Sequence, residues 1–209
     1  MKAIIYLFLA TLSLPSSGQF TGEIVYECVG DKFTEKSTLV LADDFYFQDN
    51  DVNSTYEFVS GSKSLIDIED EQIYRQWKNG NKGSKRNPYP RNFTTFGNVQ
   101  VTDTVEYMGY QCKVIEFDQP NYSKNPTHHI HYYPLNLQMD EYYEKVPAFF
   151  GYRDKFFAPF GERFVLLYMK STSSAHGRIR ETHAIKVEQK RVKKEDYLQQ
   201  IEFDEQETQ

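Results

Sequence analysis

Apolar and polar side chains alternate along most of this chain, in short runs that turn-forming residues interrupt about every ten positions. Alternation with a period of two places successive side chains on opposite faces of an extended strand, so it predicts strands with one buried face. Short strands separated by tight turns predict an antiparallel, mainly β domain. The clearest hairpins are residues 20–29 with 33–41, around Gly30-Asp31, and residues 99–107 with 110–117, around Met108-Gly109.

The rest of the chain continues this pattern with few exceptions. Short polar stretches at 49–54 and 171–177 are expected to be loops, and the longest loop covers 78–91. Residues 135–150 are the only stretch that fits a helix, and Pro147 interrupts it. Further strands are expected at 45–47, 65–68, 73–77, 128–133, 163–169 and 178–192.

The composition supports one folded domain and argues against a nucleic-acid partner. A chain of 209 residues suits a single domain and buries a sizeable core without the help of disulfides or metals. Aromatic residues make up 16% of the chain, and such residues fit half-buried sheets. The formal net charge is −6, whereas nucleic-acid-binding proteins cluster Lys and Arg against phosphates. Proteins, small apolar molecules and components of the cell envelope are the expected partners.

The beginning of the chain has the features of a cleavable signal peptide. Lys2 provides a positive charge, residues 3–14 are almost continuously apolar, and the small residues Ser16 and Gly18 follow at the positions that a signal peptidase requires. The apolar run is shorter than the about 20 residues that a membrane-spanning helix needs. We therefore predict an exported protein that is soluble or peripheral to a membrane. The expected division is a signal peptide over 1–18, a β domain over 19–201 and an unstructured tail over 202–209.

The two cysteines are candidates for one disulfide. Export makes a disulfide chemically permissible, and Cys28 and Cys112 are the only cysteines in the chain. Each follows the apolar positions of its predicted strand, so both thiols are expected to face inward. Two buried thiols that never meet give the same pattern, because sequence alone does not fix their separation. A Cys28–Cys112 disulfide is the prediction.

The densest group of candidate metal ligands is the run His128-His129-Ile130-His131. On a strand His129 and His131 share a face, at a spacing that suits zinc or copper. A third ligand is required, and no Cys, Asp or Glu nearby completes a known pattern. The simpler interpretation is that these histidines are exposed polar residues opposite Ile130 and Tyr132. We predict no metal site.

No catalytic motif stands out in the chain. The sequence contains no Gly-x-Ser-x-Gly element, no phosphate-binding loop and no dinucleotide fingerprint. The acidic run Glu69-Asp70-Glu71 falls in a predicted turn, where it solubilises the surface. We therefore predict a protein that is not an enzyme and has no cofactor. A secreted hydrolase is the remaining alternative, because the separation of two catalytic carboxylates is set by the fold and not by the sequence.

Several short motifs together resemble those of a family of exported proteins. The first is Phe20-x-Gly22-x-Ile24-x-Tyr26 at the start of the predicted mature chain. Later motifs are Asp103-Thr104, Gly109-Tyr110-Gln111-Cys112-Lys113 and Ile130-His131-Tyr132-Tyr133-Pro134, followed by the predicted hairpin over 163–192. In this order they resemble the GLPGLI-type exported proteins, whose fold is similar to that of the lipoprotein carriers LolA and LolB.

The chain departs from this family at two places. The family's name-giving Gly-Leu-Pro-Gly-Leu-Ile is replaced by Ala158-Pro159-Phe160-Gly161-Glu162, and Tyr132-Tyr133 stands where the family commonly has Trp-Tyr. The chain therefore resembles a divergent member. The resemblance implies an antiparallel sheet that curls into an open half-barrel around an apolar concavity, with one or two short helical segments. It implies a place in the periplasm or outside the cell, and no catalytic residues.

Two functions follow from this fold, and they differ in what fills the concavity. A binding protein of the envelope holds a lipid or another apolar ligand there, whereas a structural or interaction protein fills the space with its own side chains. The candidate ligand-binding residues form an aromatic group in a stretch that is not a clean strand, where it can act as a lid or complete the core. These residues are Phe149, Phe150, Phe156, Phe157 and Phe160.

Overall fold

The computed structural model describes residues 20–54, 61–70, 72–79, 84–86, 97–119, 126–137, 165–173 and 177–202. Within these ranges the chain forms eleven strands and one short helix. The elements are β1 (Gly22–Gly30), β2 (Phe33–Leu41), β3 (Phe45–Ser54), β4 (Ser62–Asp67), β5 (Gln72–Trp77), β6 (Ser84–Arg86), β7 (Gly97–Tyr107), β8 (Tyr110–Gln119), β9 (Thr127–Pro134), β10 (Tyr168–Ser173), β11 (Ile179–Gln189) and α2 (Lys194–Leu198).

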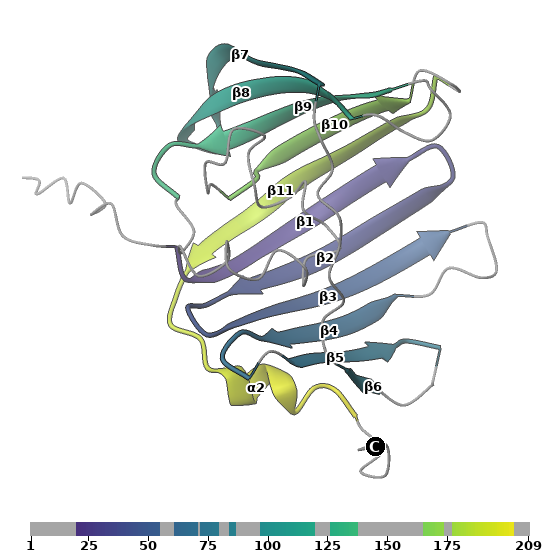
Figure 1. Ribbon diagram of the computed structural model, residues 1–209, viewed down its shortest axis with the longest axis vertical. Helices are drawn as coiled ribbons and strands as arrows, with labels where there is room; N and C mark the ends of the chain where they lie inside the picture. The colour runs from purple at the N-terminus through teal and green to yellow at the C-terminus, as the bar shows by residue number, and fades with distance from the viewer. Residues whose placement is uncertain are drawn as a thin grey trace, which may run out of the picture.

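All the strands belong to one antiparallel sheet with the order β6-β5-β4-β3-β2-β1-β11-β10-β9-β8-β7. Figure 1 shows this order as a continuous ladder, which bends most where β7 and β8 lie. The sheet is open, since the two outermost strands in the order, β6 and β7, are not paired with each other. The predicted fold class, a mainly β domain with a single open antiparallel sheet and little helix, is confirmed.

The order of the strands divides the sheet into two meanders that meet at one seam. Strands β1 to β6 follow one another on one side, and β7 to β11 follow one another on the other. The seam is the pairing of β1 with β11, which aligns Ile24 with Val187 and Cys28 with Thr182. Strands far apart in the sequence therefore lie side by side at the centre of the sheet.

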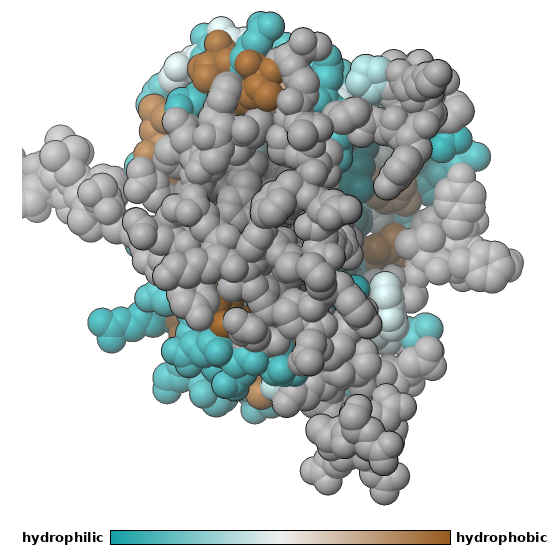
Figure 2. All heavy atoms as spheres, viewed as in Figure 1, coloured by the Kyte–Doolittle hydropathy of each residue, from teal (hydrophilic) through white to brown (hydrophobic). Residues whose placement is uncertain are grey.

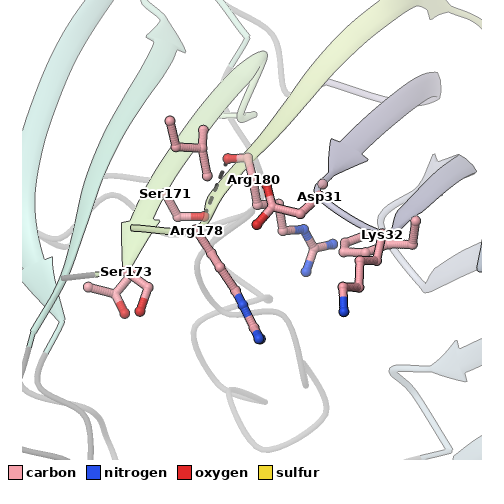
Figure 3. Close-up of a pocket in the computed structure, with 10 residues that line it drawn as sticks. Asp31, Lys32, Ser171, Ser173, Arg178 and Arg180 are labelled. Carbon is pink, nitrogen blue, oxygen red and sulfur yellow. Dashed lines mark hydrogen bonds between the residues drawn. The ribbon is translucent and has the colours of Figure 1, made fainter. Parts of the chain in front are cut away.

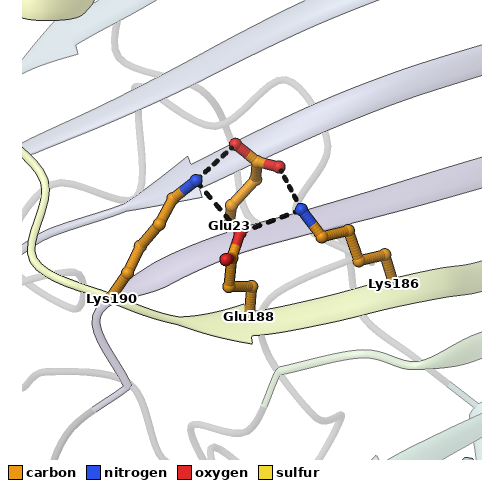
Figure 4. A network of polar contacts seen from close by, with 4 residues as sticks. All are labelled: Glu23, Lys186, Glu188 and Lys190. Atoms are coloured by element: carbon orange, nitrogen blue, oxygen red, sulfur yellow. Dashed lines mark hydrogen bonds and ion pairs between the residues drawn. The ribbon is translucent and has the colours of Figure 1, made fainter.

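A network of charged side chains lies over one end of the seam. Lys186 and Lys190 of the β11 end each contact both Glu23 and Glu188, with nitrogen–oxygen distances of 2.9–3.3 Å (Figure 4). Ion pairs on an exposed surface contribute little to stability, because water and salt screen them. The network therefore adds little, and the buried side chains of the sheet supply most of the stabilisation.

The two faces of the sheet carry different cores. We call one of them the histidine face. It is defined by a row of residues in which each is the Cα partner of the next on the neighbouring strand: Ile115, His131, Met169, Thr182, Cys28 and Glu35. On the side of β1 to β5 this face becomes apolar, with Ile24, Leu39, Tyr46 and Ile66 in one buried cluster. Burial of such side chains contributes about 1.5–3 kcal/mol each.

The opposite face is covered by the C-terminal segment over β2 to β5. Its buried cluster contains Val40, Phe47, Leu65 and Ile201, and the rings of Tyr197 and Phe47 lie 5.0 Å apart. We call it the helix face, because α2 and the residues that follow it pack there (Figure 1). The short helix is thus held by tertiary packing, since a five-residue helix is too short to be stable alone.

One expected loop, 49–54, belongs to a strand, and so do the first three residues of another, 171–173. The polar stretch after Phe47 continues β3 to Ser54, where it pairs with β2 and β4. Buried hydrogen bonds run along this stretch, from the Tyr46 hydroxyl to Gln48 Oε1 at 2.8 Å and from Gln48 Nε2 to Asn50 Oδ1 at 2.8 Å. Likewise β10 begins at Tyr168 and extends through Ser173, later than the sequence pattern indicates. Runs of polar residues favour a loop in the sequence pattern, whereas in β3 they satisfy one another inside the sheet.

The described surface exposes several large apolar side chains. Val101 and Met108 of the β7–β8 hairpin and Leu135 after β9 have 52%, 41% and 45% of their surface exposed. Figure 2 shows hydrophobic atoms at the top of the view, near the end of the sheet where β7 and β8 lie in Figure 1. Single exposed apolar residues are common on soluble proteins, so they do not define a site.

The predicted signal peptide and the predicted tail beyond Glu202 lie outside the described residues. None of the helices in the described ranges is long and apolar enough to cross a membrane.

Candidate functional site

A pocket lined entirely by described residues lies at one end of the sheet, where the turn between β1 and β2 meets the β10–β11 hairpin and the start of β9. Its volume is about 250 Å³. The turn residues Gly30, Asp31, Lys32 and Phe33 form one side, and the other side comprises Thr127, Ser171, Ser173, Arg178, Ile179 and Arg180. Figure 3 shows these residues projecting from strand ends that are distant in the sequence.

The pocket is positively charged although the chain as a whole is negative. Three cationic side chains, those of Lys32, Arg178 and Arg180, line it together with the single carboxylate of Asp31. The hydroxyl groups of its serines and threonine add neutral hydrogen-bonding groups. A pocket with this lining favours a negatively charged or strongly polar group at its mouth.

Arg180 is fixed in place by its neighbours. Its Nε donates to Cys28 Sγ at 2.9 Å, and its Nη2 donates to Glu35 Oε2 at 3.2 Å. The guanidinium carbon also lies 5.3 Å from the centre of the Phe33 ring, a cation–π contact. Glu35 is buried and Arg180 is partly exposed, so the pair is partly shielded from water, and these contacts hold Arg180 at the wall of the pocket.

Gly30 leaves room for the ring of Phe33, the aromatic residue that lines the pocket. A Cβ atom at Gly30 would come within 2.6 Å of Phe33 Cε1, closer than real side chains approach. Gly30 and Phe33 are Cα partners at the end of the β1–β2 hairpin. The absence of a side chain at Gly30 thus lets the Phe33 ring lie against the strand and beneath Arg180.

A second hollow of about 460 Å³ lies beside the first and is lined largely by charged residues, including Glu27, Lys36 and Lys78. Lys78 contacts the carboxylates of Asp49, at 2.6 Å, and Asp51, so its charge is compensated. The pKa of Lys78 is raised; burial opposes the rise, and the two carboxylates produce it. This hollow therefore resembles a surface on which charged side chains neutralise one another, and not a ligand site.

The histidines of β9 share a face, as predicted, but the prediction that they are exposed is wrong for two of them. His129 and His131 have only 5% and 0% of their surface exposed, whereas His128 lies on the other side of the strand and is exposed. The His129 ring stacks on Phe117 at 4.9 Å, and His131 Nδ1 lies 2.6 Å from the Tyr133 hydroxyl. Burial, with the neighbouring His128, lowers the pKa of His129 to about 4. Burial and His129 lower the pKa of His131 well below its ordinary value. Both rings are therefore neutral at pH 7.

A second aromatic group lies on the opposite face of the same strands. Tyr132 and Tyr168 pack with ring centres 4.5 Å apart, and the Tyr107 hydroxyl lies 3.2 Å from His183 Nδ1. Burial raises the pKa of Tyr168 to about 12, with Glu181 adding to the effect. The phenol is thus protonated at neutral pH, and the group acts as half-buried packing.

The predicted Cys28–Cys112 disulfide is not formed, and both cysteines are buried free thiols. The register connects Cys28 with Ile115 on β8, which is three residues from Cys112. Four strand spacings of about 4.8 Å also separate β1 from β8, whereas a disulfide requires Cα atoms about 4.4–6.8 Å apart. Sequence parity indicated that both cysteines are buried, but it carried no information on the order of the strands.

The candidate ligand-binding phenylalanines, Phe149, Phe150, Phe156, Phe157 and Phe160, lie outside the described residues. The pocket at the end of the sheet was not predicted from the sequence. Its cations come from two turns about 150 residues apart, Lys32 on one side and Arg178 and Arg180 on the other. Only the pairing of β1 with β11 brings these turns together.

Comparison with known proteins gives a likeness among solved structures only. No family model matches the sequence, and no curated protein matches it either. Among solved structures, the chain is similar to the crystal structure of an outer membrane lipoprotein-sorting protein domain from Vibrio parahaemolyticus. The sequence identity is 7%, the match covers 86% of this chain and 90% of that chain, and the TM-score is 0.36. These comparisons do not assign the chain to a family.

Proposed function

We propose that this protein is an exported, non-enzymatic binding protein whose pocket at the end of the sheet holds an amphipathic anion such as a fatty acid. The observation that carries the proposal is the lining of the pocket. Apolar groups of Phe33 and Ile179 stand beside the cationic groups of Lys32 and Arg178. Export is supported by the apolar run and the small residues at the start of the chain.

The two parts of the lining correspond to the two parts of such a ligand. A carboxylate forms short charge-assisted hydrogen bonds with arginine and lysine. The first methylene groups of an acyl chain gain free energy by contacting apolar side chains such as Phe33, because water is released. Arg180 is held by Glu35 and Cys28, so the ligand does not have to order this wall of the pocket on binding.

A structural role is the second candidate, and the size of the pocket favours it. Pockets for small molecules usually measure about 300–1,000 Å³, whereas this one has about 250 Å³. The described part of the chain also fills three buried clusters with its own side chains. In this case the protein acts through its surface, and the pocket has no ligand.

Binding of a fluorescent fatty acid, cis-parinaric acid, separates the two candidates. We expect saturable binding to the wild-type protein and clearly weaker binding of an alcohol of the same chain length, because the alcohol lacks the charge. One charge-assisted hydrogen bond contributes about 1.5–3 kcal/mol. Arg178→Gln should therefore weaken binding roughly 10- to 100-fold.

Arg191→Gln is the matched control, because Arg191 is an exposed arginine outside the pocket. It should bind the fatty acid as the wild type does. Equal affinity for acid and alcohol, or equal loss in the two arginine variants, would rule out the proposed role of the pocket. Absence of saturable binding to the wild type would favour the structural role.

A further inference from the structure

Among the residues that the structure describes, three ring nitrogens on the histidine face are buried without a hydrogen-bond partner. They are Nδ1 and Nε2 of His129 and Nε2 of His131. Buried polar atoms in folded proteins nearly always have a partner. Three such atoms on two neighbouring side chains of one face of a strand therefore require an explanation. A neutral imidazole carries one N–H and one lone pair, and the lone pair is a metal ligand.

The contact between His131 and Tyr133 orients the first ligand. His131 Nδ1 lies 2.6 Å from the Tyr133 hydroxyl, and Tyr133 is fully buried. In the tautomer in which Nδ1–H donates to the hydroxyl oxygen, Nε2 carries the lone pair. Metal-binding histidines commonly donate their other N–H to an oxygen in this way, which fixes the ring. The rings of His129 and His131 lie perpendicular to each other, with centres 5.6 Å apart.

A third donor comes from the neighbouring strand. Met169 of β10 is the Cα partner of His131 and is buried in the same cluster as Phe117, whose ring contacts both histidines. Directly opposite residues have Cβ atoms about 4.5–5.5 Å apart, and diagonal neighbours such as Met169 and His129 are within reach of long side chains. Methionine is flexible and has a polarisable thioether sulfur.

We propose that His129, His131 and Met169 form a binding site for a soft monovalent metal ion of the copper(I) type. All three donors are neutral, and thioether sulfur with imidazole is a donor set that suits copper(I). The surroundings are apolar, and burial of an ion without charged partners costs more for a divalent ion than for a monovalent one. Among the described residues no three His, Cys, Asp or Glu side chains gather to form a site of the zinc type.

The pocket at the end of the sheet borders this site. Ser171 lines the pocket and is the Cα partner of His129. His129 and Met169 retain 5% and 6% of their surface exposed, whereas His131 is fully buried. The proposed metal site thus lies next to the pocket in the strand register, and ion binding there does not depend on a fatty acid in the pocket.

Silver(I) tests the site directly, since it resembles copper(I) and needs no reductant. Because free thiols also bind soft metal ions, we use the full-length protein with Cys28→Ala and Cys112→Ala. We expect it to bind one Ag⁺ per chain in a chloride-free titration, and to compete for copper(I) with the chelator bicinchoninate under ascorbate. The ¹⁵N resonances of His129 and His131 should shift on addition of Ag⁺. The variants His129→Leu and Met169→Leu should each weaken binding at least about tenfold.

His128→Gln is the matched control, because His128 is on the same strand but on its exposed side. It should bind Ag⁺ as the wild type does. Met169→Leu preserves the volume of the core, so a folded variant is expected, and thermal unfolding of each variant confirms it. Wild-type affinity in folded Met169→Leu and His129→Leu, or loss of binding in His128→Gln alone, would overturn the proposal.

Discussion

At the scale of single residues, the buried histidines make the protein sensitive to acid. The pKa of His129 is lowered to about 4 by burial, followed by the influence of His128, against a weaker opposing effect of Asp118. In the unfolded chain the imidazole has a pKa of about 6.5. The unfolded state therefore binds a proton between these two values while the folded state does not, and the difference favours unfolding as the pH falls.

We expect the free energy of unfolding to be constant above about pH 6.5 and to fall by about 3 kcal/mol towards pH 4 because of His129, at about 1.4 kcal/mol per pKa unit. His131 adds to this loss in the same direction. Urea denaturation between pH 4 and pH 7.5 measures the effect. The free energy of unfolding of His129→Leu should depend less on pH than that of the wild type. His128→Gln should keep the steep dependence. A wild-type profile that coincides with that of His129→Leu would contradict the prediction.

At the scale of elements, the C-terminal helix contributes through what it covers. Ile201 is buried in the same cluster as Phe47 and Leu65, and Lys194 Nζ lies 2.9 Å from the buried carboxylate of Asp67. The backbone N–H of Glu202 also donates to Gln76 Oε1 at 3.1 Å. The segment after β11 is thus attached at both ends of the helix.

Ile201→Ala should therefore destabilise the protein by about 2–5 kcal/mol, the usual cost of truncating a buried isoleucine. Gln199→Ala, on the exposed side of the same segment, should change stability by less than about 0.5 kcal/mol. Chemical denaturation of both variants measures the difference. If both substitutions have equally small effects, the segment does not form part of the core.

The elements also show what the sequence was able to predict. Strands with clear alternation, such as residues 33–41, have the predicted bounds, because one face is apolar. The second half of β3 was missed because Gln48 and Asn50 are polar yet buried, and α2 was missed because its stabilising contacts come from distant strands. The candidate sites could not be predicted for the same reason. The cations of the pocket and the His131–Met169 pair depend on strand order, which local patterns do not contain.

At the scale of the whole molecule, the two meanders depend on one seam. Besides the pairing of β1 with β11, the buried hydroxyl of Tyr26 donates to the carbonyl oxygen of Leu166 at 2.7 Å. Burial raises the pKa of Tyr26, so the donor remains protonated. Since β1 is at one end of the chain and β11 near the other, the seam closes a long loop, and its formation is expected to be slow.

The seam should make the two meanders unfold together. Ile24 is fully buried in β1, so Ile24→Ala is expected to lower stability by about 2–5 kcal/mol. Trp77 is the only tryptophan and reports on the first meander, whereas the NMR resonances of His129 and His131 report on the second. Both probes should shift to the same lower urea midpoint, because each meander loses the neighbour that completes its sheet. Val29→Ala, at an exposed position of β1, should leave both midpoints nearly unchanged. If Ile24→Ala lowers the Trp77 midpoint and leaves the histidine midpoint at its wild-type value, the halves fold independently and the seam is only a docking contact.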